Sequence, residues 1–129
     1  MVQRPLLSST TLVGAPVTSA SVRYGPVADR ERLIAEMRRV GLEPRVADAF
    51  VCNGFARSRA IACARVRNLV ATIGPPEGRH LLLSAHYDST FAGPGAGDDG
   101  IGVATLLETA ARLDARTLRR PVTFLFNEG

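Results

Sequence analysis

The sequence predicts an α/β fold built on a mixed, mainly parallel sheet with flanking helices. Short apolar runs that are typical of strands alternate with stretches whose apolar residues recur at helical spacing. The clearest case is a helical pattern that lies between apolar runs at 81–85 and 121–126. Strand, helix and strand of these lengths form a βαβ unit, whose two strands are parallel. The length of 129 residues is that of about one domain.

The chain divides into an irregular leader and a folded part. Residues 1–26 contain Ser, Thr, Gly and Pro without periodicity, and we expect the domain to occupy residues 27–129. Four apolar residues after Asp29 recur at helical spacing: Leu33, Ile34, Met37 and Val40. The pattern predicts a first helix that Asp29 caps at its amino end and Gly41 ends.

Three strands are expected between this helix and a central Gly-rich loop. Arg45–Cys52 is the first candidate, and residues 64–73 and 79–85 follow. The segment Gly74–Gly78, GPPEG, has a length suited to a hairpin loop, which predicts that 64–73 and 79–85 are antiparallel neighbours. Residues 81–83 are all leucine, and this lack of alternation is expected of a strand that is covered on both faces.

A second helix is predicted from Ile101 through Asp114, and Pro121–Phe126 is predicted to be the last strand. The apolar residues at helical spacing in this helix are Ile101, Val103, Leu106, Leu107, Ala110 and Leu113. Because only three residues follow the last strand, we expect the chain to be the front portion of a larger domain.

The composition excludes several classes of function. All sixteen basic residues are arginines, scattered without a long run, and aromatic residues make up 5%. We therefore expect no nucleic-acid partner, in spite of the net charge of +4. No apolar run has the roughly eighteen residues of a membrane span, and the amino-terminal segment is too polar for a signal-peptide core. Localisation stays open.

The two cysteines, Cys52 and Cys63, fit neither a CxxC redox motif nor a four-thiolate zinc site. They are either a disulfide or two inert thiols, and the second is the simpler interpretation.

A candidate metal site surrounds the central loop. His86 and Asp88 lie two apart on a nearly extended chain, so their side chains tend to point to the same side. Asp98 and Asp99 stand just before the second helix. Each pair has a simpler interpretation, as a hydrogen-bonded pair at a strand end and as a turn or an N-cap. Their conjunction past the carboxyl end of a strand favours a site for a zinc-like divalent ion.

The motifs AHYDS and GPGAGDDGIG, followed by a strand that ends FLFNEG, resemble the M28 family of zinc peptidases. The resemblance covers about 28–129 and is strongest from Asn68 onward. It implies an α/β/α sandwich with two zinc ions, in which His86 ligates one zinc and Asp98 bridges both. Asp88 would orient His86. The Asp98–Asp99 peptide bond is the candidate for the cis bond of the family.

The resemblance also implies hydrolysis of terminal peptide bonds in a peptide or protein substrate. In the family, a Glu-Glu pair beyond the FLFNEG strand supplies the general base and a further zinc ligand. Glu128 lies ahead of that pair, so we expect it to be a loop neighbour and the base to be absent from this chain. With only His86 and Asp98 as zinc ligands, the chain alone is expected to be inactive.

Two alternatives remain open beside the peptidase. The first is a non-catalytic binding module that keeps the fold without the metal centre. The second is a zinc-dependent acyltransferase such as a glutaminyl cyclase. The choice between amino- and carboxypeptidase action, the substrate preference and the oligomeric state are not readable from these residues.

Overall fold

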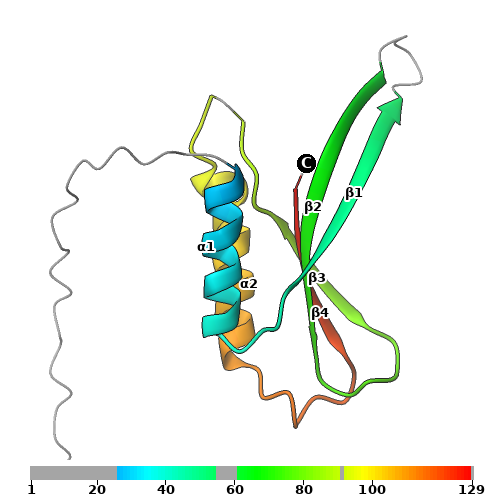
Figure 1. The fold of residues 1–129 in the computed structure, drawn as a ribbon. Coiled ribbons are helices and arrows are strands. Elements are labelled where there is room, and N and C mark those ends of the chain that lie inside the picture. The colour runs from blue at the N-terminus through cyan, green and yellow to red at the C-terminus, as the bar shows by residue number, and fades with distance from the viewer. Residues whose placement is uncertain (1–25, 55–60, 91, 129) are drawn as a thin grey trace, which may run out of the picture.

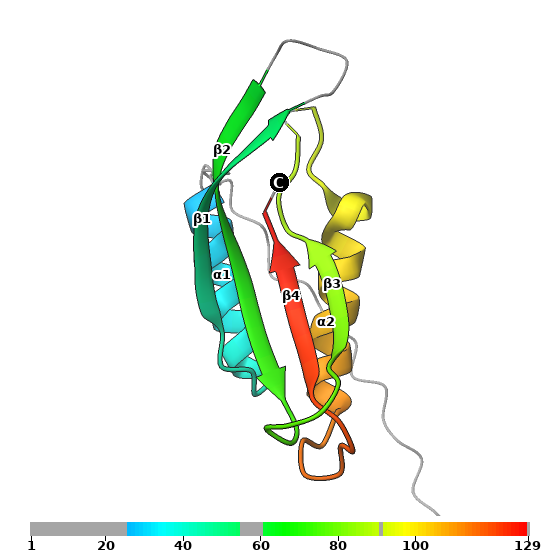
Figure 2. The same ribbon diagram turned by 90° about the vertical axis from the view of Figure 1, so that its right-hand side faces the viewer.

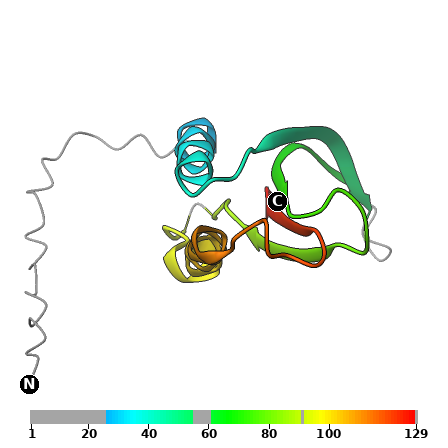
Figure 3. The same ribbon diagram turned by 90° about the horizontal axis from the view of Figure 1, so that it is seen from below.

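The computed structural model describes residues 26–54, 61–90 and 92–128. They form a four-stranded mixed sheet with two helices on one of its faces (Figures 1 and 3). The elements are α1 (Pro26–Arg39), β1 (Arg45–Gly54), β2 (Ile61–Ile73), β3 (Leu81–His86), α2 (Ile101–Arg112) and β4 (Val122–Asn127). The predicted leader, except for Pro26, lies outside the described residues. No helix among the described residues is long and apolar enough to cross a membrane.

The strand order confirms the α/β fold with a mixed sheet and makes two corrections. Two of the three pairings in the described sheet are antiparallel, so this part of the sheet is not mainly parallel as expected. The order is β1-β2-β4-β3 (Figure 2), and β3 pairs with β4 in parallel, as the βαβ unit requires. β2 pairs with β4 and not with β3, so Gly74–Gly78 does not close a hairpin and that prediction was wrong. The residue types in a loop predict a turn, but they do not specify which strands pair with each other. β4 is one of the two inner strands, and its Phe124 and Phe126 are fully buried there.

Helix α1 begins earlier than expected and ends as predicted. It starts at Pro26, a residue suited to the first helical position, so Asp29 lies in the first turn and is not the N-cap. Gly41 has a φ of +85°, and the Leu42 N–H donates to the carbonyl oxygen of Met37 at 2.9 Å. This is a Schellman ending, in which a left-handed glycine lets the chain reverse and bury its next apolar side chain.

The core lies between the two helices and the sheet face that they cover. Its buried members are Leu33, Met37, Leu42, Leu69, Ala71, Ala85, Leu106, Ala110, Val122, Phe124 and Phe126. Leu81 and Leu82 are instead 47% and 57% exposed, so the expectation of a strand covered on both faces was wrong. Both described helices lie on the same face, and β3 is an edge strand of the described sheet.

The β1–β2 hairpin extends past the rest of the sheet (Figure 1) and carries a disulfide. Its register places Cys52 directly opposite Cys63, and the two are bonded. The expectation of two inert thiols was therefore wrong, because it considered spacing along the chain and not the register of the strands. On the same hairpin Arg65 Nε donates to Asp48 Oδ1 at 2.7 Å. This hydrogen bond lowers the pKa of Asp48 below its ordinary value.

Candidate metal centre

The candidate ligands meet beyond the carboxyl end of β3. His86 is the last residue of this strand, and Asp88 lies in the loop that follows. Asp98 lies in a wide turn, Ala96–Gly100, directly before α2, and it has a non-helical φ of −132°. Strand and turn therefore bring together residues that are separated by twelve positions. This is the edge at which open α/β sheets place their functional groups.

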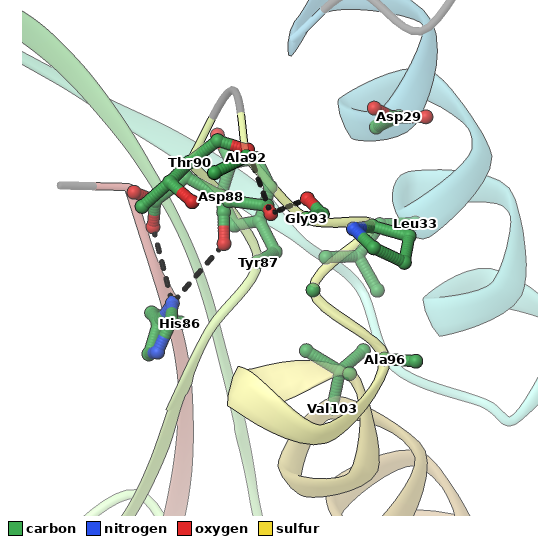
Figure 4. Close-up of a pocket in the computed structure, with 14 residues that line it drawn as sticks. Asp29, Leu33, His86, Tyr87, Asp88, Thr90, Ala92, Gly93, Ala96 and Val103 are labelled. Atoms are coloured by element: carbon green, nitrogen blue, oxygen red, sulfur yellow. Dashed lines mark hydrogen bonds and ion pairs between the residues drawn. The ribbon is translucent and has the colours of Figure 1, made fainter.

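The imidazole of His86 lies between two acidic residues. Its Nε2 atom is 2.9 Å from Asp98 Oδ1. Its Nδ1 atom is 3.2 Å from the carbonyl oxygen of Asp88 and 3.4 Å from Asp88 Oδ1, contacts that Figure 4 shows as dashed lines. The structure thus brings the three predicted residues together around one ring.

The surroundings of His86 favour its doubly protonated form, because both ring nitrogens face acceptors. The hydrogen bond with Asp98 raises the pKa of His86 above its ordinary value, and the carbonyl and the carboxylate of Asp88 add to the effect. Loss of water around the ring opposes them. A proton on Nε2 therefore occupies the place, between imidazole and carboxylate, that a cation would take.

The donor set fits a zinc ion. Imidazole nitrogen and carboxylate oxygen are both zinc ligands, and two ligands of one tetrahedral zinc lie about 3.3 Å apart. Among the described residues, buried Asp88 Oδ1 has no hydrogen-bond partner, although it lies beside Nδ1 of His86. A ligating histidine usually donates its second N–H to such an oxygen. In residues 26–54, 61–90 and 92–128 no group of three or more potential ligands gathers, so the described part supplies two ligands at this place.

Asp99 makes a different contact from its neighbour. Its Oδ1 atom accepts the N–H of Gly102 at 3.1 Å, in the first turn of α2. The Asp98–Asp99 peptide bond is cis, as the family resemblance led us to expect.

Behind the HYD segment lies a network that the sequence did not predict. The Tyr87 hydroxyl donates to the carbonyl oxygen of Arg67 at 2.7 Å, and the Arg67 N–H donates to Glu128 Oε2 at 2.6 Å. The Glu128 N–H donates to Asn68 Oδ1 at 2.9 Å. Burial raises the pKa of Tyr87 to about 12, and the charge of Glu128 adds to this. No local pattern could reveal this network, because residues 60 and 61 positions apart make its contacts.

A cavity of about 860 Å³ adjoins the site. His86 and Asp88 lie on its polar side, while Leu33 of α1 and Val103 of α2 contribute apolar surface (Figure 4). Its volume is in the range of sites that bind small molecules.

Comparison with known proteins finds a family that resembles the second half of the chain. Residues 68–129 match peptidase family M28. A vacuolar membrane protease of Lachancea thermotolerans is 37% identical over 79 residues, which cover 60% of this chain and 8% of that protein. A glutaminyl-peptide cyclotransferase-like protein of Mus musculus is 43% identical over 88 residues, which cover 58% of this chain and 23% of that protein.

A solved structure shares the fold as well. The glutaminyl cyclase of Porphyromonas gingivalis matches with a TM-score of 0.60 and 27% identity, over 78% of this chain and 35% of that one. The match covers only 8% and 23% of the length of the two curated relatives named above. The matched family segment contains His86, Asp88, Asp98 and Asp99. Residues 68–129 of this chain are therefore similar to peptidase family M28.

Proposed function

We propose that this chain contributes His86 and Asp98 as ligands to the zinc centre of a metal-dependent hydrolase that acts on peptides. The observation that carries the proposal is the distance of 2.9 Å between His86 Nε2 and Asp98 Oδ1, with Asp88 against the other ring nitrogen. The names of the M28 relatives, which include a protease, support it.

Each of the three residues has a distinct part in this proposal. Asp88 accepts the Nδ1 proton of His86 and so keeps the lone pair of Nε2 free for a metal ion. Asp98 is 96% exposed, so its second carboxylate oxygen is free to reach a second cation. Bound zinc polarises a carbonyl group and lowers the pKa of a coordinated water. Among the described residues, we assign no general base that would take a proton from that water.

The finer proposal is an exopeptidase, which removes residues from the end of a peptide. The M28 resemblance is its main support. The cavity of about 860 Å³ beside His86 is in the size range of small-molecule sites and leaves room for the end of a peptide.

The test of the zinc site uses the two histidines of the full chain. Addition of Zn²⁺ should shift the ring resonances of His86 in an NMR titration and leave those of His80 unchanged. Asp98→Asn should abolish the zinc-dependent shift of His86, and both His86→Ala and Asp98→Asn should lower the zinc affinity measured by competition with a chelator. His80→Ala is the matched control, because His80 contacts Thr123 at the other end of the sheet. An unchanged zinc affinity in both site variants would refute the proposal.

A zinc-dependent acyltransferase is the second candidate. The structural match to a glutaminyl cyclase and the 43% identity to a cyclotransferase-like protein favour it. Product analysis with peptides that begin with glutamine separates the two reactions. A cyclase releases ammonia and leaves a cyclised amino terminus, whereas an exopeptidase releases a free amino acid.

A non-catalytic binding module is the third candidate, and it predicts a different experimental result. Such a module has no use for the two ligands together. It should bind its partner equally well after His86→Ala and Asp98→Asn, and chelation of zinc should have no effect on that binding.

A further inference from the structure

We propose that Asp99 is a positioning residue, which accepts the Gly102 N–H and thereby holds the turn before α2 so that Asp98 faces His86. The effect of this positioning role on zinc affinity rests on the function proposed above. The contact between Asp98 and His86, by contrast, is a property of the metal-free chain and is testable by itself.

The side chain of Asp98 is not held by packing. It is 96% exposed, and within the described part of the chain its one hydrogen-bond partner is Nε2 of His86. An exposed side chain that makes one contact retains most of its rotamer freedom unless the backbone restricts where it can reach. The orientation of Asp98 must therefore come from the backbone on either side of it.

Asp99 supplies that restraint on the carboxyl side. Its Oδ1 atom accepts the Gly102 N–H at 3.1 Å, and Gly102 is the second residue of α2. The first N–H groups of a helix have no partner within the helix, so a carboxylate at this position satisfies one of them. Its negative charge is also favourable at the amino end of a helix.

The surrounding glycines make this close contact feasible. A Cβ atom at Gly102 would overlap the carboxylate of Asp99, so a larger residue would displace the cap. On the other side of the turn, the Gly100 N–H donates to the carbonyl oxygen of Gly95 at 2.8 Å. A Cβ atom at Gly100 would lie 2.9 Å from that oxygen. The backbone that carries Asp98 is thus fixed on both sides.

The competing explanation is that Asp99 is itself a metal ligand or acts through its charge. Substitution separates the two, because asparagine caps a helix about as well as aspartate but lacks the charge. Asp99→Asn should therefore preserve a capping role and destroy a ligand role. Asp99→Ser, which also keeps a capping oxygen, provides a second variant if Asp99→Ala lowers the helix content.

The experiment first follows the Nε2–H signal of His86 by NMR in the metal-free full chain. The signal should stay protected from exchange in Asp99→Asn and Asp99→Ser, and should be lost in Asp99→Ala and Gly102→Ala. Zinc affinity should then fall by about tenfold or more in the last two variants, the range that is typical of residues that orient a ligand. It should change less than about twofold in Asp99→Asn. Circular dichroism monitors the folding of α2.

Two results would overturn the inference. One is a protected His86 signal in both Asp99→Ala and Gly102→Ala. The other is a loss of signal and affinity in Asp99→Asn and Asp99→Ser as large as in Asp99→Ala. If Asp98→Asn leaves zinc affinity unchanged while Asp99→Ala still removes the His86 signal, the proposed zinc site fails and the positioning role of Asp99 stands.

Discussion

The Nδ1 atom of His86 lies 3.4 Å from Asp88 Oδ1, a buried oxygen that has no hydrogen-bond partner in the part of the chain that the structure describes. A buried carboxylate oxygen without a partner is costly unless some state of the protein supplies one. Rotation of the ring by a small angle would let Nδ1–H reach it, which is the arrangement that supports a ligating histidine. This contact connects the loop after β3 with the proposed metal centre, so the role of Asp88 can be tested by substitution.

Asp88→Ala should weaken zinc binding without abolishing it. His86 and Asp98 remain as ligands in this variant, but the orientation of the imidazole is lost, which typically costs 10–100-fold in metal affinity. A competition titration with a zinc chelator measures the change. Ser89→Ala is the matched control, because the Ser89 hydroxyl contacts Gly93 and not His86. Equal affinities of Asp88→Ala and Ser89→Ala would contradict the assignment.

Tyr87 should make stability fall at high pH. Its pKa in the folded chain is about 12, above its ordinary value of 10.0, because burial disfavours the phenolate. The stabilisation is complete below pH 10 and is lost as pH rises towards 12, since the unfolded chain releases the proton first. Thermal unfolding measured across this window should show the decline in the wild type and a smaller one in Tyr87→Phe. Identical profiles would count against the burial of the hydroxyl.

Asp48 should have the opposite dependence, at low pH. The Arg65 hydrogen bond lowers its pKa in the folded chain below 3.8. Its stabilisation is therefore present above that pH and is lost as pH falls through the lowered value. Asp48→Asn should be less stable than the wild type at neutral pH, and the two should converge in acid. Because Arg65 is the first cause of the shift, Arg65→Gln should remove most of the same difference.

Phe126→Ala should destabilise the fold strongly. The side chain is fully buried in the central strand β4, and loss of a buried phenylalanine costs about 3–5 kcal/mol. Denaturant unfolding measures the change in the free energy of unfolding. Phe50→Ala is the matched control, because Phe50 is 73% exposed on the hairpin and should lose far less. Similar losses for the two variants would contradict the placement of the core.

Much of the local structure was predictable because local rules determine it. The apolar spacing of Leu33 and Met37 predicted α1, and Gly41 predicted its end through a left-handed turn. The spacing of Leu106 and Ala110 predicted α2. These patterns depend on a few neighbouring residues, so they can be interpreted without knowledge of the rest of the chain.

The pairing of the strands was less accessible. The GPPEG loop was interpreted as a hairpin, yet β4 lies between the two strands that the loop connects. The disulfide between Cys52 and Cys63 likewise depends on the register of β1 against β2. Register and order follow from which strands bury the most apolar surface together, and this competition involves the whole sheet.

By itself, the sequence determined which groups stand near the ends of the elements: an imidazole at the end of β3 with a carboxylate just after it, and two carboxylates before α2. Only the tertiary structure decided that His86 and Asp98 come within 2.9 Å, and that Asp99 contacts Gly102 instead. Residue type and spacing specify what chemistry is available along the chain. The parallel packing of β3 beside β4, with α2 returning over the sheet, decides which of those groups meet in space.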